Sequence, residues 1–125
     1  MPDLIIRRCT VEDFQGMTPA MKSEGLIINP NASYFGAWLD SRLIGIAGIV
    51  WSAGSCKFTA DYIILEERRK GYLKMLFDHC LSLARGAGKR YVTAYCTAAA
   101  LPFWLMRGAR ITSRYSHTTK VRLTL

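Results

Sequence analysis

Residues 63–77 constrain the fold of this 125-residue chain more than any other stretch. An apolar, strand-like run ends in the charged turn 66–70, the turn reaches Gly71, and a helical pattern begins at once. From Leu73, apolar residues recur at positions 76, 77, 80 and 84, which is the spacing of one buried helix face. The sequence therefore predicts a strand that leads directly into an amphipathic helix.

The junction between this strand and this helix is suited to binding an anion. The first N–H groups of a helix have no partners within it, and the helix dipole adds positive charge at the same end. Four cationic side chains lie in the same short stretch: Arg68, Arg69, Lys70 and Lys74. A solvated turn before an amphipathic helix explains the same residues, so both interpretations stay open at this point.

Length and composition predict one folded domain over residues 1–125. Half of the residues are hydrophobic and 21% are charged, which is an ordinary globular balance. No apolar run reaches the length of a membrane span, and the N-terminus lacks the pattern of a signal peptide. We therefore expect a cytoplasmic protein without a membrane partner.

The cysteines and the net charge limit the classes of ligand. The thiols are scattered, with no paired spacing and no nearby histidine, so we expect buried, reduced side chains and no metal site at Cys9, Cys56, Cys80 and Cys96. The net charge of +8 favours a phosphorylated ligand or a nucleic acid. The charge alone does not choose between them.

The remaining patterns predict the order of the elements. Apolar or alternating runs bounded by turn residues predict strands over 4–8, 34–39, 43–51, 56–65, 91–96, 109–116 and 119–125. Helical patterns cover a first segment that starts at Thr10 and is limited or kinked by Pro19, then 73–85 and 98–107. Short turns join the second, third and fourth strands into an antiparallel meander, and the helix 73–85 permits parallel pairing of the strands that flank it.

Two segments resemble motifs of the GNAT superfamily, the acyl-CoA-dependent N-acyltransferases. Residues 68–73, Arg-Arg-Lys-Gly-Tyr-Leu, resemble the Q/R-x-x-G-x-G/A loop of that family, with Leu73 where Gly or Ala is usual. Residues 100–109 resemble its late helix, A-x-x-F/L-Y-x-x-x-G-F, and the order of elements is similar over nearly the whole chain. The resemblance implies an α+β fold, with a mixed, mostly antiparallel twisted sheet of about seven strands and helices on both faces.

The resemblance also implies a cofactor and the residues that hold it. The acyl donor would be acetyl-CoA, with its pyrophosphate at the loop and its pantetheine arm along the preceding strand, and no metal would take part. Carried over residue by residue, the coenzyme-binding set is Ile63, Ile64, Leu65, Arg68, Arg69, Lys70, Gly71, Tyr72, Leu73, Lys74 and Trp104.

Candidate catalytic residues follow from the chemistry of amine acylation, which needs a base for the amine. Asp61 is the nearest carboxylate on the strand before the loop; apolar neighbours would raise its pKa, whereas pairing with an arginine is the structural alternative. Trp104 stands where the resemblance places a tyrosine acid, and an indole N–H cannot deliver a proton. Tyr95 and Tyr115 are the substitutes that we consider. Cys96 is more simply explained as a buried filler than as a nucleophile.

The leading hypothesis is an enzyme that transfers an acetyl group directly from coenzyme A to a primary amine of an unidentified acceptor. A second hypothesis keeps the fold but acts on nucleic acid, as Mom-type DNA modification enzymes do, because cations are dense at Arg107, Arg110, Arg114, Lys120 and Arg122. A third is a non-catalytic module that binds coenzyme A or a partner. A homodimer through exposed sheet edges is a further expectation.

Overall fold

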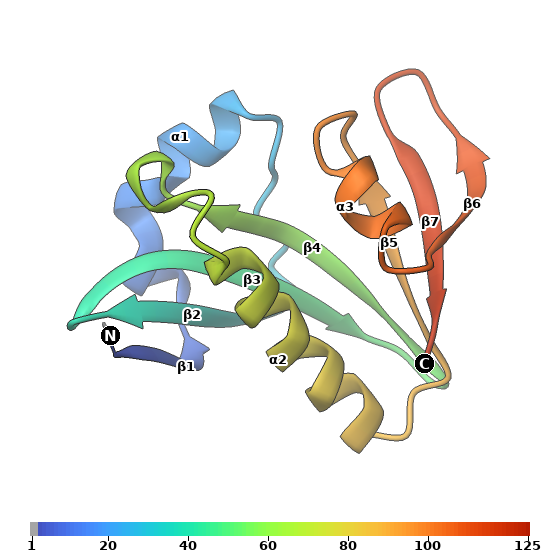
Figure 1. Ribbon diagram of the computed structural model, residues 1–125, viewed down its shortest axis with the longest axis horizontal. Coiled ribbons are helices and arrows are strands. Elements are labelled where there is room, and N and C mark those ends of the chain that lie inside the picture. Colours follow the sequence, from blue (N-terminus) through green and yellow to red (C-terminus); the bar gives the residue numbers. More distant parts are fainter. Residues whose placement is uncertain (1–2) are drawn as a thin grey trace.

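The computed structural model describes residues 3–125 as one seven-stranded mixed sheet with helices on both faces (Figure 1). The strands lie side by side in the order β1-β2-β3-β4-β5-β7-β6. Their bounds are β1 Leu4–Cys9, β2 Ser33–Leu39, β3 Arg42–Trp51, β4 Ser55–Ile63, β5 Tyr91–Cys96, β6 Arg110–Arg114 and β7 Thr119–Thr124. The expected α+β fold, the meander from β2 to β4 and the parallel pairing of β4 with β5 are confirmed.

The helical segments match the sequence patterns in position and differ in length. A 3₁₀ helix over Val11–Met17 leads into α1, Thr18–Ser23, and Pro19 lies in the first turn of α1, where its missing N–H is tolerated. Helix α2 runs over Tyr72–Gly86, and α3 covers only Leu101–Leu105. The prediction for α3 was too long, because residues 98–100 form a turn.

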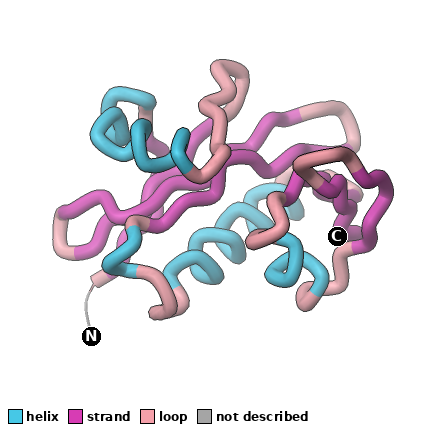
Figure 2. Tube along the Cα trace, turned by 90° about the horizontal axis from the view of Figure 1, so that it is seen from above, coloured by secondary structure: helices cyan, strands magenta, loops and turns pink. Residues whose placement is uncertain are grey.

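Figure 2 shows helices on both faces of the sheet, and the side chains between the helices and the sheet form two hydrophobic cores. The larger core packs α2 and α3 against the sheet, and the buried positions of α2 repeat at helical spacing at Leu76, Phe77, Cys80, Leu81 and Ala84. The smaller core packs Phe14 and Met21, from the N-terminal helical segment, against Tyr34, Ile46 and Tyr62 of the sheet. All four cysteines are buried and free, as expected.

Strand β4 contains a β-bulge in its pairing with β3. Thr59 pairs with Gly48, and Tyr62 pairs with Ile46, so two residues of β4 lie opposite one residue of β3. This is a β-bulge, and Ala60 within it has the positive φ of 55°. Before the bulge, Phe58 packs in the larger core; after it, Tyr62 packs in the smaller one. The bulge therefore changes which side chains of β4 face α2.

Strands β4 and β5 separate at the bulge. Their parallel pairing covers only residues 55–58 of β4, ending where Phe58 meets Ala94. Beyond that point β4 stays paired with β3 as far as Ile63, and β5 stays paired with β7 as far as Cys96. Figure 1 shows the two strands diverging towards the N-terminal end of α2. The sheet is thus open at its centre along residues 59–63, which we call the open half of β4.

Several predicted boundaries need correction. Strand β4 ends at Ile63 rather than at residue 65, because Leu65 begins a 3₁₀ turn over Leu65–Glu67. Strand β6 covers five residues instead of the eight expected over 109–116, since Ala109 belongs to the connection from α3 and residues 115–116 belong to the hairpin turn. Within residues 3–125, none of the helices combines the length and the hydrophobicity of a transmembrane segment.

Candidate functional site

A cavity of about 710 Å³ occupies the opening between the end of β4 and the N-terminus of α2. Its walls combine apolar and charged side chains, which include Ile63, Tyr72, Leu73, Phe103, Arg68 and Arg69. The turn 97–100 after β5 closes the opposite side. This volume falls within the range of about 300–1,000 Å³ that is usual for small-molecule sites.

The N-terminus of α2 borders this larger cavity and presents free donors there. Gly71 caps the helix in the left-handed conformation, with φ of 85°. A Cβ at Gly71 would meet no atom within 4 Å, so the positive φ, and not lack of space, favours glycine. The first helical hydrogen bond runs from the Met75 N–H to the Gly71 carbonyl at 3.1 Å. The N–H groups that precede Met75 are therefore open to an anion.

The four cations of the loop differ in their partners. The Arg68 Nε donates to the Ile63 carbonyl at 2.7 Å, and its Nη2 pairs with Glu24 at 2.7 Å. Lys70 pairs with Glu67, and Lys74 pairs with Asp78, each at 2.7 Å. Within the described chain, Arg69 has no ion pair, although it lines the larger cavity at a positive φ of 65°. Arg69 is therefore the cation best placed for a ligand, whereas Arg68 is engaged in holding the cavity wall.

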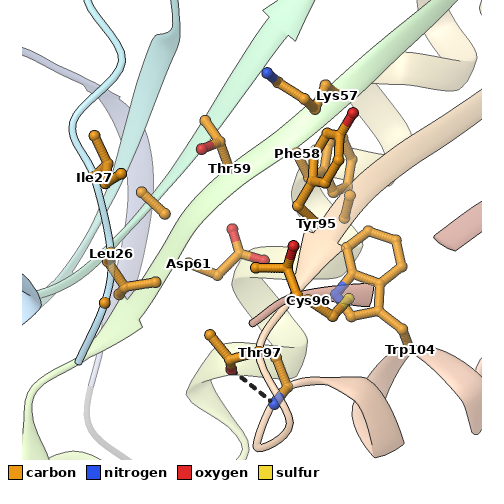
Figure 3. A pocket seen from close by; sticks show the side chains of 15 residues that line it. Leu26, Ile27, Lys57, Phe58, Thr59, Asp61, Tyr95, Cys96, Thr97 and Trp104 are labelled. Atoms are coloured by element: carbon orange, nitrogen blue, oxygen red, sulfur yellow. Dashed lines mark hydrogen bonds between the residues drawn. The ribbon is translucent and has the colours of Figure 1, made fainter. Parts of the chain in front are cut away.

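A second, smaller cavity of about 220 Å³ passes through the gap between β4 and β5 (Figure 3). Lys57, Thr59 and Tyr95 line the part that faces away from α2, and Phe58, Cys96 and Trp104 line the part on the α2 side. The loop at Leu26 and Ile27 forms the remaining wall. Asp61, Leu26, Thr97 and Ala100 line both cavities, so the two adjoin at these four residues.

Asp61 is the only ionisable residue of the four that the two cavities share. Its Oδ1 is buried and has no hydrogen-bond partner among residues 3–125, and no cation pairs with it. Burial raises the pKa of this carboxyl from 3.8 to about 7. The expected rise in the pKa is therefore present, and the alternative of an arginine partner is wrong. A carboxyl with this pKa exchanges a proton readily near neutral pH.

The chain superimposes on solved N-acetyltransferases over nearly its whole length. PaiA N-acetyltransferase from Thermoplasma acidophilum, crystallised with coenzyme A, is 14% identical at a TM-score of 0.83, over 98% of this chain and 99% of that one. Ard1 from Thermoplasma volcanium is 16% identical at a TM-score of 0.82, over 98% and 97% of the two chains. The chain has the GNAT fold.

A larger protein contains the same fold as one part. N-acetylglutamate synthase from Neisseria gonorrhoeae, crystallised with coenzyme A and L-arginine, is 17% identical at a TM-score of 0.80; the match covers 98% of this chain and 33% of that one. The chain thus spans about a third of that enzyme. Neither the profiles of known protein families nor the sequences of curated proteins match the chain.

The predicted coenzyme residues divide into two groups on this GNAT fold. Those that line the larger cavity are Ile63, Arg68, Arg69, Gly71, Tyr72, Leu73 and Lys74. Ile64 lies outside it, because its N–H donates to the Ile44 carbonyl at 2.8 Å and its side chain packs against the core. Leu65 is 74% exposed in the 3₁₀ turn, and Lys70 pairs with Glu67 and does not line the cavity. The chain leaves β4 at Ile63 and enters the 3₁₀ turn, which is why Ile64 and Leu65 lie outside the cavity.

The position expected for a general acid is filled by a core side chain. Trp104 is 3% exposed, and its ring packs edge-on against Phe77 at 5.0 Å and Phe58 at 5.9 Å between centroids. It borders the smaller cavity and is absent from the wall of the larger one. Tyr95 lines the smaller cavity, whereas Tyr115 lies beside Tyr95, at 5.9 Å between ring centroids, and lines neither cavity.

Cys96 and the histidines contribute less to the site. Burial raises the pKa of the Cys96 thiol to about 11, which leaves too little thiolate near neutral pH for a nucleophile. His79 is half-buried on α2 beside Phe35, and His117 is exposed in the last hairpin turn. Among residues 3–125, no group of three or more His, Cys, Asp or Glu side chains is placed to hold a metal ion.

Sequence patterns missed several residues of the cavity walls. Leu26 and Thr97 line both cavities, Phe103 lines the larger one, and Lys57 lines the smaller one. Thr97 directly follows β5, and the rule that ligands bind beyond the carboxyl ends of neighbouring parallel strands could have identified it. No local signal marks Leu26, because its role depends on a loop folding over a strand that lies more than 30 residues later.

Proposed function

We propose that this protein is an N-acyltransferase that moves an acetyl group from acetyl-CoA to a primary amine. One observation carries the proposal: a buried carboxyl without a partner, Asp61, stands where two cavities meet in the gap of a GNAT fold. The larger cavity is suited to the donor and the smaller one to the acceptor. The coenzyme A in the solved structures of similar fold is consistent with this assignment.

The residues of the larger cavity fit coenzyme A by their chemistry. Free N–H groups at the start of α2 and the unpaired guanidinium of Arg69 suit the pyrophosphate. The unpaired edge of the open half of β4 offers backbone groups to the amide-containing pantetheine arm, and Tyr72, Leu73 and Phe103 supply apolar contacts. Acetyl-CoA would supply the acyl group as an activated thioester.

Acetyl transfer also requires a group that removes a proton from the amine. An amine in the smaller cavity is protonated at neutral pH and must lose a proton to become a nucleophile; the Asp61 carboxylate accepts it. The nitrogen then forms a bond to the acyl carbon while the carbon–sulfur bond breaks. A second proton leaves the nitrogen and reaches the departing thiolate through solvent. Tyr95 lines the smaller cavity and Tyr115 does not. The Tyr95 hydroxyl, however, is turned towards Lys57 and away from Asp61 (Figure 3), so neither tyrosine is assigned as the acid.

The two other hypotheses, an enzyme that acts on nucleic acid and a non-catalytic module, predict different ligands. Two basic residues of the C-terminal region are engaged with aromatic rings: Arg107, in the turn after α3, stacks on Phe103 at 3.4 Å, and Arg122 on β7 stacks on Tyr91 at 3.6 Å. A nucleic-acid enzyme would still bind polyanions with strong dependence on salt. A non-catalytic module would bind coenzyme A and release no thiol. Nothing in the packing around Asp61 favours either one over transfer.

The test is a thermal-shift titration with acetyl-CoA, free CoA and ATP on three proteins. These are the wild type, Gly71→Asp and Gly71→Asn, a pair of variants that are isosteric and differ only in charge at the helix cap. A ligand at 100 times its dissociation constant adds about 2.7 kcal/mol, which moves the melting temperature by several degrees. We expect both CoA species to stabilise the wild type and Gly71→Asn, and neither to stabilise Gly71→Asp.

Thiol release from acetyl-CoA in the presence of primary amines then separates transfer from binding. Equal stabilisation by ATP, or no stabilisation by CoA, would overturn the donor site and with it the proposed function. Binding without thiol release for any amine would leave a coenzyme-binding module.

A further inference from the structure

Two uncompensated charges of opposite sign stand at the two ends of the smaller cavity. Asp61 lies in the gap between β4 and β5, and no cation pairs with it in the described chain. Lys57 lies on the part that faces away from α2, and no carboxylate of residues 3–125 comes within ion-pair distance of its Nζ. The lysines of the loop differ in this respect, because Lys70 and Lys74 each have a carboxylate at 2.7 Å.

A second cation strengthens the positive end. The Nζ atoms of Lys57 and Lys120 lie 5.8 and 5.6 Å from the ring centroid of Tyr95, so two ammonium groups share one aromatic ring. Figure 3 shows the Tyr95 hydroxyl on the side of Lys57 and away from Asp61. Tyr95 is 48% exposed, so this cluster faces solvent at the mouth of the cavity. Lys57 lines the smaller cavity and Lys120 lies beside it across the same ring, so both add positive charge around Tyr95, which favours an anion there.

The size of the cavity limits what can enter. At about 30 Å³ for each water in the liquid, 220 Å³ is the space of about seven waters. Lys57 and Asp61 are four residues apart on β4, which would be roughly 13 Å along an extended strand and is less here because of the bulge at Ala60. A narrow molecule that reaches Asp61 with an amine can therefore keep a second group several bonds away, at the mouth.

We propose that the acceptor is a small amine that also carries an anionic group, with its amine at Asp61 and its anion at Lys57 and Lys120. This inference rests on the acyl transfer proposed above and specifies its substrate class. Recognition would follow from charge complementarity, since the cavity is negative inside and positive at its mouth. Diamines and the side chains of basic peptides would bring a second positive charge next to Lys57 and Lys120. Alkylamines have no anionic group to pair with these two lysines.

The experiment compares three ω-amino carboxylates with the amines that lack only the carboxylate. The pairs are β-alanine with ethylamine, γ-aminobutyrate with propylamine, and ε-aminocaproate with pentylamine. Thiol release from acetyl-CoA is followed for the wild type, Lys57→Gln and Lys22→Gln. Lys22 is exposed on α1 and lines neither cavity, so its variant controls for the loss of one positive charge.

For the wild type, kcat/KM should be about five- to tenfold higher for at least one carboxylate than for its partner amine, as expected for one charged contact. Lys57→Gln should remove that preference, mainly by raising KM for the carboxylate, and should lower kcat/KM for the alkylamine much less than for the carboxylate. Lys22→Gln should retain the preference. Equal use of both members of every pair by the wild type, or an equal loss for both in Lys57→Gln, would overturn the inference.

Binding provides a readout that needs no turnover. In CoA-loaded protein, the carboxylates should shift the backbone amide signals of Thr59 and Cys96 more strongly than the alkylamines do, and Lys57→Gln should abolish the difference. Absence of these shifts for all three carboxylates overturns the inference. So does salt-sensitive binding of a single-stranded oligonucleotide that depends on Lys57, because the anion would then belong to a polymer. Failure of CoA to stabilise the protein would instead overturn the proposed function.

Discussion

The two halves of strand β4 share one backbone and have different surroundings. Residues 55–58, the paired half, lie between β3 and β5, whereas the open half keeps only β3 as a partner. In the paired half, Phe58 packs against the rings of Phe77 and Trp104. In the open half, Asp61 keeps a buried oxygen without a partner. Strand β4 therefore contributes to the core where it pairs with β5, and it lines the candidate site where β5 diverges from it.

The bulge at Ala60 accounts for the difference. Without the extra residue, Asp61 would lie on the same face as Lys57 and Thr59, because side chains alternate along a strand. With it, the carboxyl is buried in the gap near Cys80 and Cys96, whose thiol pKa values are raised mainly by burial and further by the Asp61 charge. A positive φ at an alanine costs about 1–3 kcal/mol. Strain of this kind, next to an unpaired carboxyl, is typical of functional sites.

The largest effect that we expect tests the open half. Asp61→Asn keeps the shape of the side chain and removes its ability to accept a proton, so acetyl transfer should fall by about 10²–10⁴-fold. The loss should appear in kcat with the amine that the wild type uses best, while CoA still stabilises the variant. A variant with nearly wild-type turnover would show that Asp61 is not the base.

The next effect tests the paired half. Trp104→Ala removes a buried ring that contacts Phe58 and Phe77, so it should lower the free energy of unfolding by about 3–5 kcal/mol. Trp51→Ala is the matched control, because Trp51 is exposed at the end of β3 and should change stability by less than about 1 kcal/mol. Urea denaturation of both variants measures the difference. Similar losses would mean that Trp104 is not the structural residue described above.

The third prediction concerns the pH dependence of stability that the buried Asp61 carboxyl causes. The pKa of Asp61 is about 7 in the folded protein and 3.8 without burial, so the folded state binds the proton more tightly. Stability therefore falls as the pH rises from about 4 to about 7, by up to about 4 kcal/mol at about 1.4 kcal/mol per pKa unit. Asp61→Asn removes this dependence.

The variant should accordingly be more stable than the wild type above about pH 8, with little difference below about pH 4. Urea denaturation at the two pH values checks this sign. A stability difference that does not change with pH would mean that Asp61 is solvated or paired in solution. The comparison also separates function from folding, because the catalytically impaired protein is expected to be the more stable one at high pH.

Sequence patterns alone were sufficient to predict those helices and strands whose signals are local. The apolar spacing after Gly71 identified α2 to within one residue at each end, and β5 was predicted with its exact bounds over Tyr91–Cys96. The meander from β2 to β4 followed from short turns between apolar runs. These signals are reliable because helix and strand periods reflect which face of a segment is buried, and that face is encoded within a few neighbouring residues.

The candidate site, in contrast, depends on tertiary contacts. Three features create it: the bulge that changes the direction of Asp61, the separation of β4 from β5, and the ion pair between Arg68 and Glu24. Each depends on segments that are distant in sequence. An arginine in a basic loop has the same local pattern whether it binds a ligand or a carboxylate 44 residues away. The partners of a charged side chain, and the absence of one for Asp61, depend on which segments fold against it. The residues next to a charged side chain in the sequence therefore do not indicate which partner it will have in the folded protein.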